Sequence, residues 1–191
     1  SLLIEEGIAV NSTASLDYSD VEAVKVLGNP TEGALLLWLK KAGVDYLNLR
    51  ESAEVLEELP FSTERKYMAT VVKSSLLQGK TILYVKGAPE IVCGLCKHIE
   101  NNVSKADIEK QLMEYQNQAM RTLGFAYQIL DDKQEVLKDG KVAADNLTFM
   151  GIVAISDPVR KDVPAAVAEC MNAGINVKIV TGDTPGTAKE I

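Results

Sequence analysis

The segment from Tyr84 to Glu90 places a cation, a glycine and a helix start close together in the chain. An apolar, strand-like run, Thr81 to Val85, leads into Lys86 and Gly87, and Pro89 suits the first turn of a helix. Glycine lets a ligand approach the main chain without a Cβ in the way, and the free N–H groups at a helix start favour anions. One cation, an open backbone and a helix start aimed at one spot suit the binding of a nucleotide.

A second candidate is Phe61, one of only three phenylalanines, which follows Pro60 in a polar segment. An aromatic ring offers a face on which a base can stack, with a contribution on the order of 1–3 kcal/mol. The alternative is that Phe61 packs beneath the hairpin predicted for residues 67–73 and 81–86.

Several short motifs follow one another in an order that resembles the P-type cation-transporting ATPases, most closely their calcium-pump branch. The resemblance covers nearly the whole chain and implies a nucleotide-binding domain with part of the phosphorylation domain. The motifs that carry it are Gly28-Asn29-Pro30-Thr31-Glu32, Phe61-Ser62-Thr63-Glu64-Arg65-Lys66-Tyr67-Met68, Lys86-Gly87-Ala88-Pro89-Glu90, Arg121-Thr122-Leu123, Asp157-Pro158-Val159-Arg160 and Thr181-Gly182-Asp183.

The resemblance also implies which residues contact ATP. Phe61 would stack on adenine, Glu32 would accept a hydrogen bond from its amino edge, and Arg121 would reach the phosphates. Taken singly, a glutamate at a helix start can instead satisfy the helix dipole, and lysines can lie on a solvated face. Thr63 departs from the pattern, because many calcium pumps carry a basic residue there. The full implied set is Glu32, Phe61, Lys66, Lys86, Gly87, Ala88, Arg121 and Leu123.

Phosphoryl transfer is implied for the C-terminal motifs. Thr181, Gly182 and Asp183 resemble the segment that contacts the γ-phosphate and helps to organise Mg²⁺, and Asp157 resembles the hinge motif between the two domains. The transfer also needs an acceptor. The family's phosphorylated aspartate lies in an Asp-Lys-Thr-Gly-Thr motif that the chain does not contain; Asp132-Lys133 shares only its first two letters. We therefore expect the chain to bind ATP without autophosphorylation, with Mg²⁺ needed mainly in the intact pump.

Composition sets broader bounds. The chain has 191 residues, with 20 Lys and Arg against 27 Asp and Glu and a net charge of −7, so we expect no nucleic-acid partner. No apolar run approaches the roughly 18 residues of a membrane helix. Three cysteines fit a reducing compartment better than a disulfide framework. The chain starts without Met and ends at Ile191 in what reads as a helix. We expect a piece of a longer pump on the cytoplasmic face of a membrane, whose partners are the remaining phosphorylation, actuator and transmembrane parts.

The predicted fold class is α/β (α+β). Residues 1–147 are expected to form the nucleotide-binding domain, an antiparallel sheet flanked by helices. Residues 148–191 are expected to be a partial phosphorylation domain, a βαβ piece of a haloacid-dehalogenase-like doubly wound fold, whose first strand is buried on both faces. The elements predicted for the first domain are helices at 29–43, 50–58, 90–96 and 104–120, a half-buried hairpin at 67–73 and 81–86, and a strand at 123–130.

Other readings have less support in the sequence. A phosphatase of the haloacid dehalogenase type needs an Asp-x-Asp nucleophile motif, and no two aspartates stand two positions apart. A second alternative is an interaction domain that keeps the fold but binds no ligand. The presence of Phe61, Lys66, Lys86, Gly87 and Arg121 argues against it. Cys93, Cys96 and His98 have metal-like spacing but no second pair to complete four ligands, so we predict no metal site. Gly79-Lys80-Thr81 resembles a Walker A end, but Ser74 stands where its first glycine belongs.

Overall fold

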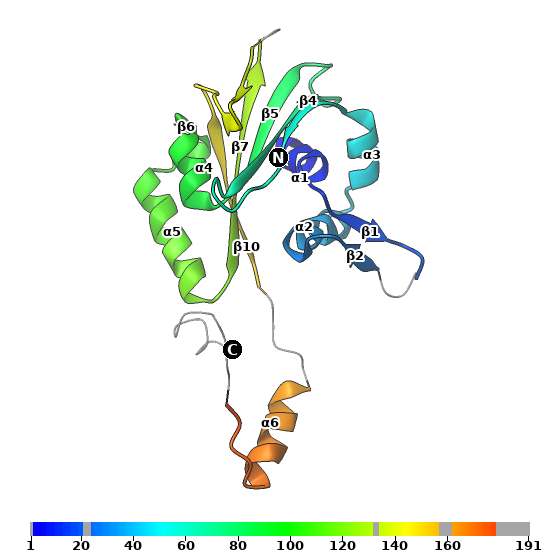
Figure 1. Ribbon diagram of the computed structural model, residues 1–191, viewed down its shortest axis with the longest axis vertical. Coiled ribbons are helices and arrows are strands. Elements are labelled where there is room, and N and C mark those ends of the chain that lie inside the picture. Colours follow the sequence, from blue (N-terminus) through cyan, green and yellow to red (C-terminus); the bar gives the residue numbers. More distant parts are fainter. Residues whose placement is uncertain (1, 21–23, 132–133, 157–161, 179–191) are drawn as a thin grey trace.

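A six-stranded sheet organises the protein, as the computed structural model shows for residues 2–20, 24–131, 134–156 and 162–178 (Figure 1). The strand order is β3-β4-β5-β7-β10-β6. Every neighbouring pair is antiparallel except β10 with β6, which is parallel. The strands are β3 (Glu54–Leu59), β4 (Tyr67–Lys73), β5 (Thr81–Gly87), β6 (His98–Ile99), β7 (Arg121–Leu130) and β10 (Thr148–Ile155). The antiparallel sheet predicted from the sequence is therefore confirmed.

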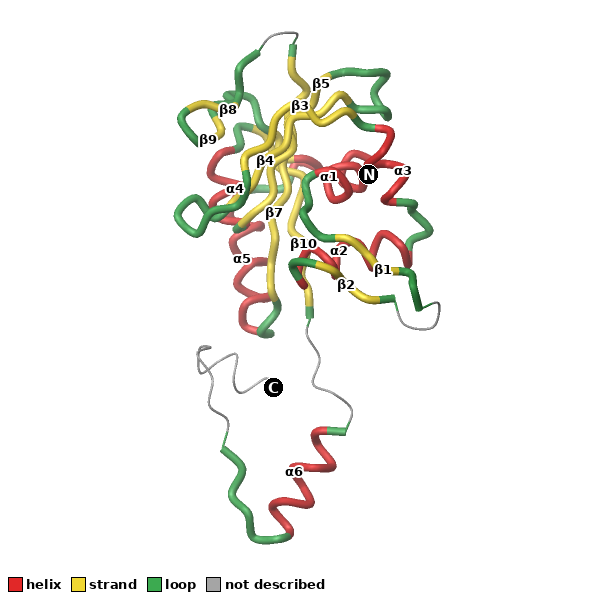
Figure 2. Tube along the Cα trace, turned by 45° about the vertical axis from the view of Figure 1, so that its right-hand side comes forward, coloured by secondary structure: helices red, strands yellow, loops and turns green. Residues whose placement is uncertain are grey.

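Helices cover both faces of this sheet (Figures 1 and 2). On one face lie α1 (Leu2–Val10), α2 (Pro30–Lys41) and α3 (Tyr46–Ser52), and on the other lie α4 (Pro89–Leu95) and α5 (Lys105–Asn117). Successive side chains of a strand point to opposite faces of the sheet, so each central strand contributes side chains to both helical layers. In β5, Ile82 and Tyr84 pack toward α1, whereas Leu83 and Val85 pack with Val92 of α4.

The central hairpin is more buried than its sequence suggested. Its strands β4 and β5 pair from Tyr67↔Gly87 to Lys73↔Thr81, within one residue of the predicted hairpin. However, six of the seven residues in each strand are buried, so the prediction of a half-buried pair is wrong. Polar residues such as Thr70 and Lys86 do not mark a solvent face here, because helices cover both sides and supply their hydrogen-bond partners.

Side-chain caps define the starts of α2 and α5. The Asn29 side chain accepts hydrogen bonds from the N–H groups of Thr31 and Glu32, and Pro30 follows in the first turn of α2. Ser104 caps α5 in a capping box with Asp107, at the start of the helix predicted for residues 104–120.

The segment from Arg50 to Glu58 does not form the helix that was predicted. Helix α3 ends at Ser52, and Glu54–Leu59 becomes the edge strand β3, which pairs with β4. Glutamate and leucine favour a helix intrinsically, but pairing with a formed sheet overrides that preference. Residues Glu54 to Glu58 are all exposed, so they do not alternate between buried and exposed positions as the residues of a half-buried strand would.

Two small hairpins and a short helical turn complete the elements that the structure describes before residue 148. They are β1 (Ser15–Asp17) with β2 (Lys25–Leu27), β8 (Leu137–Lys138) with β9 (Lys141–Val142), and the 3₁₀ turn Glu100–Asn102.

Strand β10 pairs antiparallel with β7 and so continues the sheet of the preceding residues. Most of its residues are half-buried, so the prediction of a strand buried on both faces is wrong. Helix α6 (Val163–Asn172) lies where the helix of the expected βαβ piece falls in the sequence, and it contains no buried residue. The second strand of the expected βαβ unit extends into residues outside the described part, and the domain boundary at residue 147 stays a prediction.

Candidate functional site

A cleft of about 390 Å³ lies between the N-terminus of α2, the start of β4 and the junction of β5 with α4. This volume falls within the range typical of small-molecule sites, roughly 300–1,000 Å³. The residues that line it are Thr13, Asn29, Thr31, Glu32, Phe61, Lys66, Met68, Lys86, Gly87, Ala88, Thr122 and Leu123.

The cleft brings together most of the residues singled out from the sequence. Seven of the eight implied nucleotide contacts line it. The eighth, Arg121, is exposed at the start of β7, where its Nη1 donates to Thr31 Oγ1 at 3.5 Å, and Thr31 lines the cleft. The four residues implied in phosphoryl transfer, Asp157, Thr181, Gly182 and Asp183, lie outside the described residues.

Thr13, Asn29, Thr31, Met68 and Thr122 also line the cleft, although no site role was predicted for them. Asn29, Thr31, Met68 and Thr122 stand inside the quoted motifs, so sequence neighbourhood was a usable signal for them. Thr13 precedes β1 and carries no such signal. Only folding brings it to the cleft.

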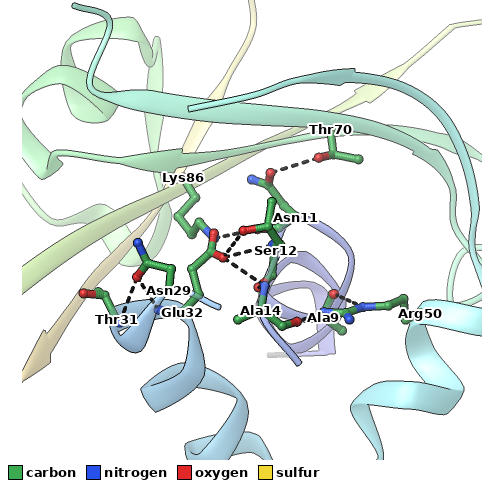
Figure 3. Close-up of polar contacts among 11 residues, drawn as sticks. Ala9, Asn11, Ser12, Ala14, Asn29, Thr31, Glu32, Arg50, Thr70 and Lys86 are labelled. Carbon is green, nitrogen blue, oxygen red and sulfur yellow. Dashed lines mark hydrogen bonds and ion pairs between the residues drawn. The ribbon is translucent and has the colours of Figure 1, made fainter. Parts of the chain in front are cut away.

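Lys86 lies at the bottom of the cleft and joins three elements (Figure 3). Its Nζ donates to Glu32 Oε1 at 2.7 Å and to the carbonyl oxygen of Asn11 at 2.6 Å. The lysine side chain is 5% exposed and that of Glu32 is 10% exposed. Strand β5, helix α2 and the end of α1 are therefore held together by one ammonium group.

The other carboxylate oxygen of Glu32 is also occupied. Oε2 accepts hydrogen bonds from the Thr13 N–H at 2.9 Å, the Thr13 hydroxyl at 2.8 Å and the Ala14 N–H at 3.1 Å. Burial by itself would raise the pKa of the Glu32 carboxyl, but the Lys86 ammonium and these hydrogen bonds together lower it. Burial likewise lowers the pKa of Lys86, and the Glu32 carboxylate opposes that change. The geometry is that of a paired carboxylate and ammonium.

The sequence predicted that Gly87 leaves room for a ligand, but in the structure it leaves room for the neighbouring backbone. A Cβ at this position would lie 2.3 Å from the carbonyl oxygen of Lys66 and 2.6 Å from Tyr67 Cα. The glycine is therefore required by the close approach of the chain at the start of β4. That same carbonyl accepts a hydrogen bond from the Ala88 N–H at 2.9 Å, which closes one wall of the cleft.

Phe61 stands at the cleft in the loop between β3 and β4, and it is 57% exposed. It is absent from the buried cores, so the alternative that it packs beneath the hairpin is not supported. An exposed aromatic ring beside a cleft with a mainly apolar lining is available to stack on a planar ligand.

Cys93 and Cys96 lie away from this cleft and are both buried free thiols. Burial raises the pKa of Cys93, and it raises the pKa of Cys96 to about 12, so both thiols stay protonated. His98 Nε2 lies 2.8 Å from Asn146 Oδ1. Within the described ranges, no group of three or more His, Cys, Asp or Glu side chains could hold a metal ion.

Comparison with known proteins gives a consistent result. Residues 1–162 match the family model described as P-type ATPase, cytoplasmic domain N. "Calcium-transporting ATPase PAT1" of Dictyostelium discoideum is 37% identical over 99% of this chain, and "Calcium-transporting ATPase 10, plasma membrane-type" of Arabidopsis thaliana is 33% identical over 99%. "Calcium-transporting ATPase 1" of Lactococcus lactis is 32% identical over 92% of the chain.

The chain spans 17%, 19% and 20% of the lengths of these three relatives. Among the described residues, no helix is long and apolar enough to cross a membrane. The match to the family model, the motif order and the mostly antiparallel six-stranded sheet agree with one another. The chain belongs to the P-type ATPases and corresponds to their cytoplasmic N domain.

Proposed function

We propose that this chain is the ATP-binding module of an ion-translocating P-type ATPase, with the adenine of ATP seated in the cleft beside Phe61. The observation that carries the proposal is the meeting of Phe61, Lys66 and Lys86, together with Glu32, in one cleft of suitable volume. These residues come from the β3–β4 loop and from β5 and α2, which are far apart in the sequence.

Different residues of the cleft and its edge would contact the base and the phosphates of a nucleotide. The ring of Phe61 provides a face for the base. Glu32 Oε1 accepts one hydrogen bond, from Lys86, and keeps a second lone pair as an acceptor for an amino group, and the backbone at Gly87 and Ala88 borders the space. Arg121 stands at the edge, where it can meet phosphates that project out of the cleft. This order from base to phosphates points the γ-phosphate away from the core.

The remaining functional expectations extend this proposal to the whole protein. Residues 148–191 would belong to the phosphorylation domain, in which Asp157, Thr181, Gly182 and Asp183 support phosphoryl transfer and Mg²⁺ binding. The actuator and transmembrane parts would lie outside this chain, on the cytoplasmic side and in the membrane respectively. The names of the relatives favour calcium as the transported ion.

The proposal is tested by titrating the protein with ATP, by NMR or calorimetry, alongside Phe61→Ala and Lys86→Ala. We expect saturable binding with a Kd in the millimolar range, about −4 kcal/mol, because phosphate contacts outside this chain are missing. Binding should be strongly weakened in both variants. A folded protein that shows no saturable binding, or unchanged binding in Phe61→Ala, would contradict the proposal.

A second measurement addresses catalysis. With labelled γ-phosphate and Mg²⁺, we expect no acid-stable label on the chain, because the phosphorylated aspartate motif is absent from it. Stable incorporation of label would show that another residue serves as acceptor.

A further inference from the structure

The loop from Pro60 to Lys66 presents Phe61 to the cleft and carries its own hydrogen bonds. The Lys66 N–H donates to the Ser62 carbonyl oxygen at 2.8 Å, and the Arg65 N–H donates to Ser62 Oγ at 3.1 Å. Lys66 has a positive φ of 60°, which turns the chain into β4. The loop therefore returns on itself within a few residues of Phe61.

Arg65 closes this loop from within. Its Nη2 donates to the carbonyl oxygen of Pro60, the carbonyl of the peptide bond that leads into Phe61. Its guanidinium carbon lies 5.9 Å from the centroid of the Tyr67 ring. Tyr67 is 5% exposed, pairs with Gly87 in the sheet, and accepts a hydrogen bond from the Val142 N–H on its hydroxyl, so it provides a rigid platform for the guanidinium.

The far end of the loop is fixed as well. The Lys66 carbonyl oxygen accepts a hydrogen bond from Ala88, at the junction of β5 and α4. Arg65 itself does not line the cleft, and its Nε is buried without a partner among the described residues. The guanidinium is thus committed to the loop backbone and the Tyr67 ring, and is not directed into the space where a ligand would sit.

We propose that Arg65 is a positioning residue for nucleotide binding, which holds the Phe61 ring at the cleft through the Pro60 carbonyl. The inference rests on the proposed function, because it assigns Arg65 a role in that same site. The planar guanidinium suits this task, since it can donate to the carbonyl and stack on Tyr67 at the same time. A cation that contacts phosphates directly would act differently, and the two roles can be separated by experiment.

The test is a double-mutant cycle of Arg65→Ala and Phe61→Ala, with ATP and adenosine as probes in NMR titrations. If Arg65 acts through Phe61, Arg65→Ala should weaken binding of ATP and of adenosine by the same factor, about threefold to tenfold. In the Phe61→Ala background, Arg65→Ala should cause no further loss. Lys73→Ala, which removes an exposed cation paired with Glu54, is the matched control and should change neither affinity.

Other patterns of affinity loss would overturn the inference. A loss confined to ATP, sensitive to salt and still present in the Phe61→Ala background would show that Arg65 contacts phosphates and would overturn the inference. Additive losses for adenosine would overturn it too. If Arg65→Ala does not fold, Arg65→Lys keeps the charge but lacks the planar guanidinium, so a loss of affinity and the same non-additivity with Phe61→Ala are expected. Unchanged ATP affinity in Phe61→Ala alone would instead reject the proposed nucleotide site.

Discussion

Lys86 Nζ and Glu32 Oε1 lie 2.7 Å apart in the interior, although the two residues are separated by 54 positions in the sequence. The pair ties a central strand of the sheet to the first turn of α2, and Asn11 adds the end of α1 to the same point. The bottom of the candidate nucleotide cleft is therefore an ion pair, whose own hydrogen bonds define its shape. Stability and ligand binding should depend on the same groups.

The first prediction concerns this pair. Lys86→Met should lower the free energy of unfolding by about 3 kcal/mol, because it leaves the Glu32 carboxylate buried without its cation. The double variant with Glu32→Gln should lose clearly less than the sum of the two single changes. Urea denaturation of the four proteins measures the coupling. Simple additivity of the single effects would show that the two side chains do not stabilise each other.

The second prediction concerns acid stability. The pKa of Glu32 is lowered in the folded protein from its ordinary value of 4.5. The carboxylate therefore contributes its full stabilisation above about pH 4.5, and that contribution is lost as the pH falls through the lower folded value. The stability difference between the protein and Glu32→Gln should shrink over this acid range. Glu54→Gln, at an exposed ion pair, is the control and should have little effect at any pH.

The third prediction concerns Gly87. Gly87→Ala should destabilise the protein by about 2 kcal/mol or more, because the new Cβ meets the Lys66 carbonyl oxygen at 2.3 Å, and backbone atoms cannot move aside cheaply. Gly94→Ala, in helix α4, meets nothing within 4 Å and should be neutral or stabilising by up to about 1 kcal/mol. Thermal unfolding of both variants provides the measurement. Equal stability of the two would contradict the close approach at Gly87.

The fourth prediction separates the base from the phosphates. Phe61→Ala should weaken adenosine, ADP and ATP by a similar factor, about tenfold, because stacking on the base does not depend on the phosphates. Its melting temperature should change little, since the side chain is 57% exposed. Trp38→Ala, at another exposed aromatic outside the cleft, is the control and should not alter binding.

The fifth prediction concerns Arg121. Arg121→Ala should weaken ATP binding at low salt and leave adenosine binding unchanged, because an exposed cation at the edge of the cleft can act only on the phosphates. Calorimetry at two salt concentrations, with Lys41→Ala as an exposed cation outside the cleft, distinguishes a local contact from net charge. A loss of adenosine affinity in Arg121→Ala would place the arginine beside the base instead.

The sequence by itself determined the features that depend on neighbouring residues. The starts of α2 and α5 rest on contacts within a few residues, and β4 and β5 are neighbours in the chain joined by a short turn, so a local pattern was sufficient to locate them. The motif order also identified the family, because those motifs are short and continuous.

Tertiary structure decided the rest. Segment Glu54–Leu59 has helix-favouring residues and became a strand, because it could pair with β4. The partners of Lys86 come from α1 and α2, and no periodicity in the sequence records that meeting. Gly87 and Arg65 owe their roles to backbone atoms, the Lys66 and Pro60 carbonyls, which every residue possesses and no sequence pattern distinguishes. The sequence shows which residue types are present, but the distances between them, on which binding depends, are set only by the folded structure.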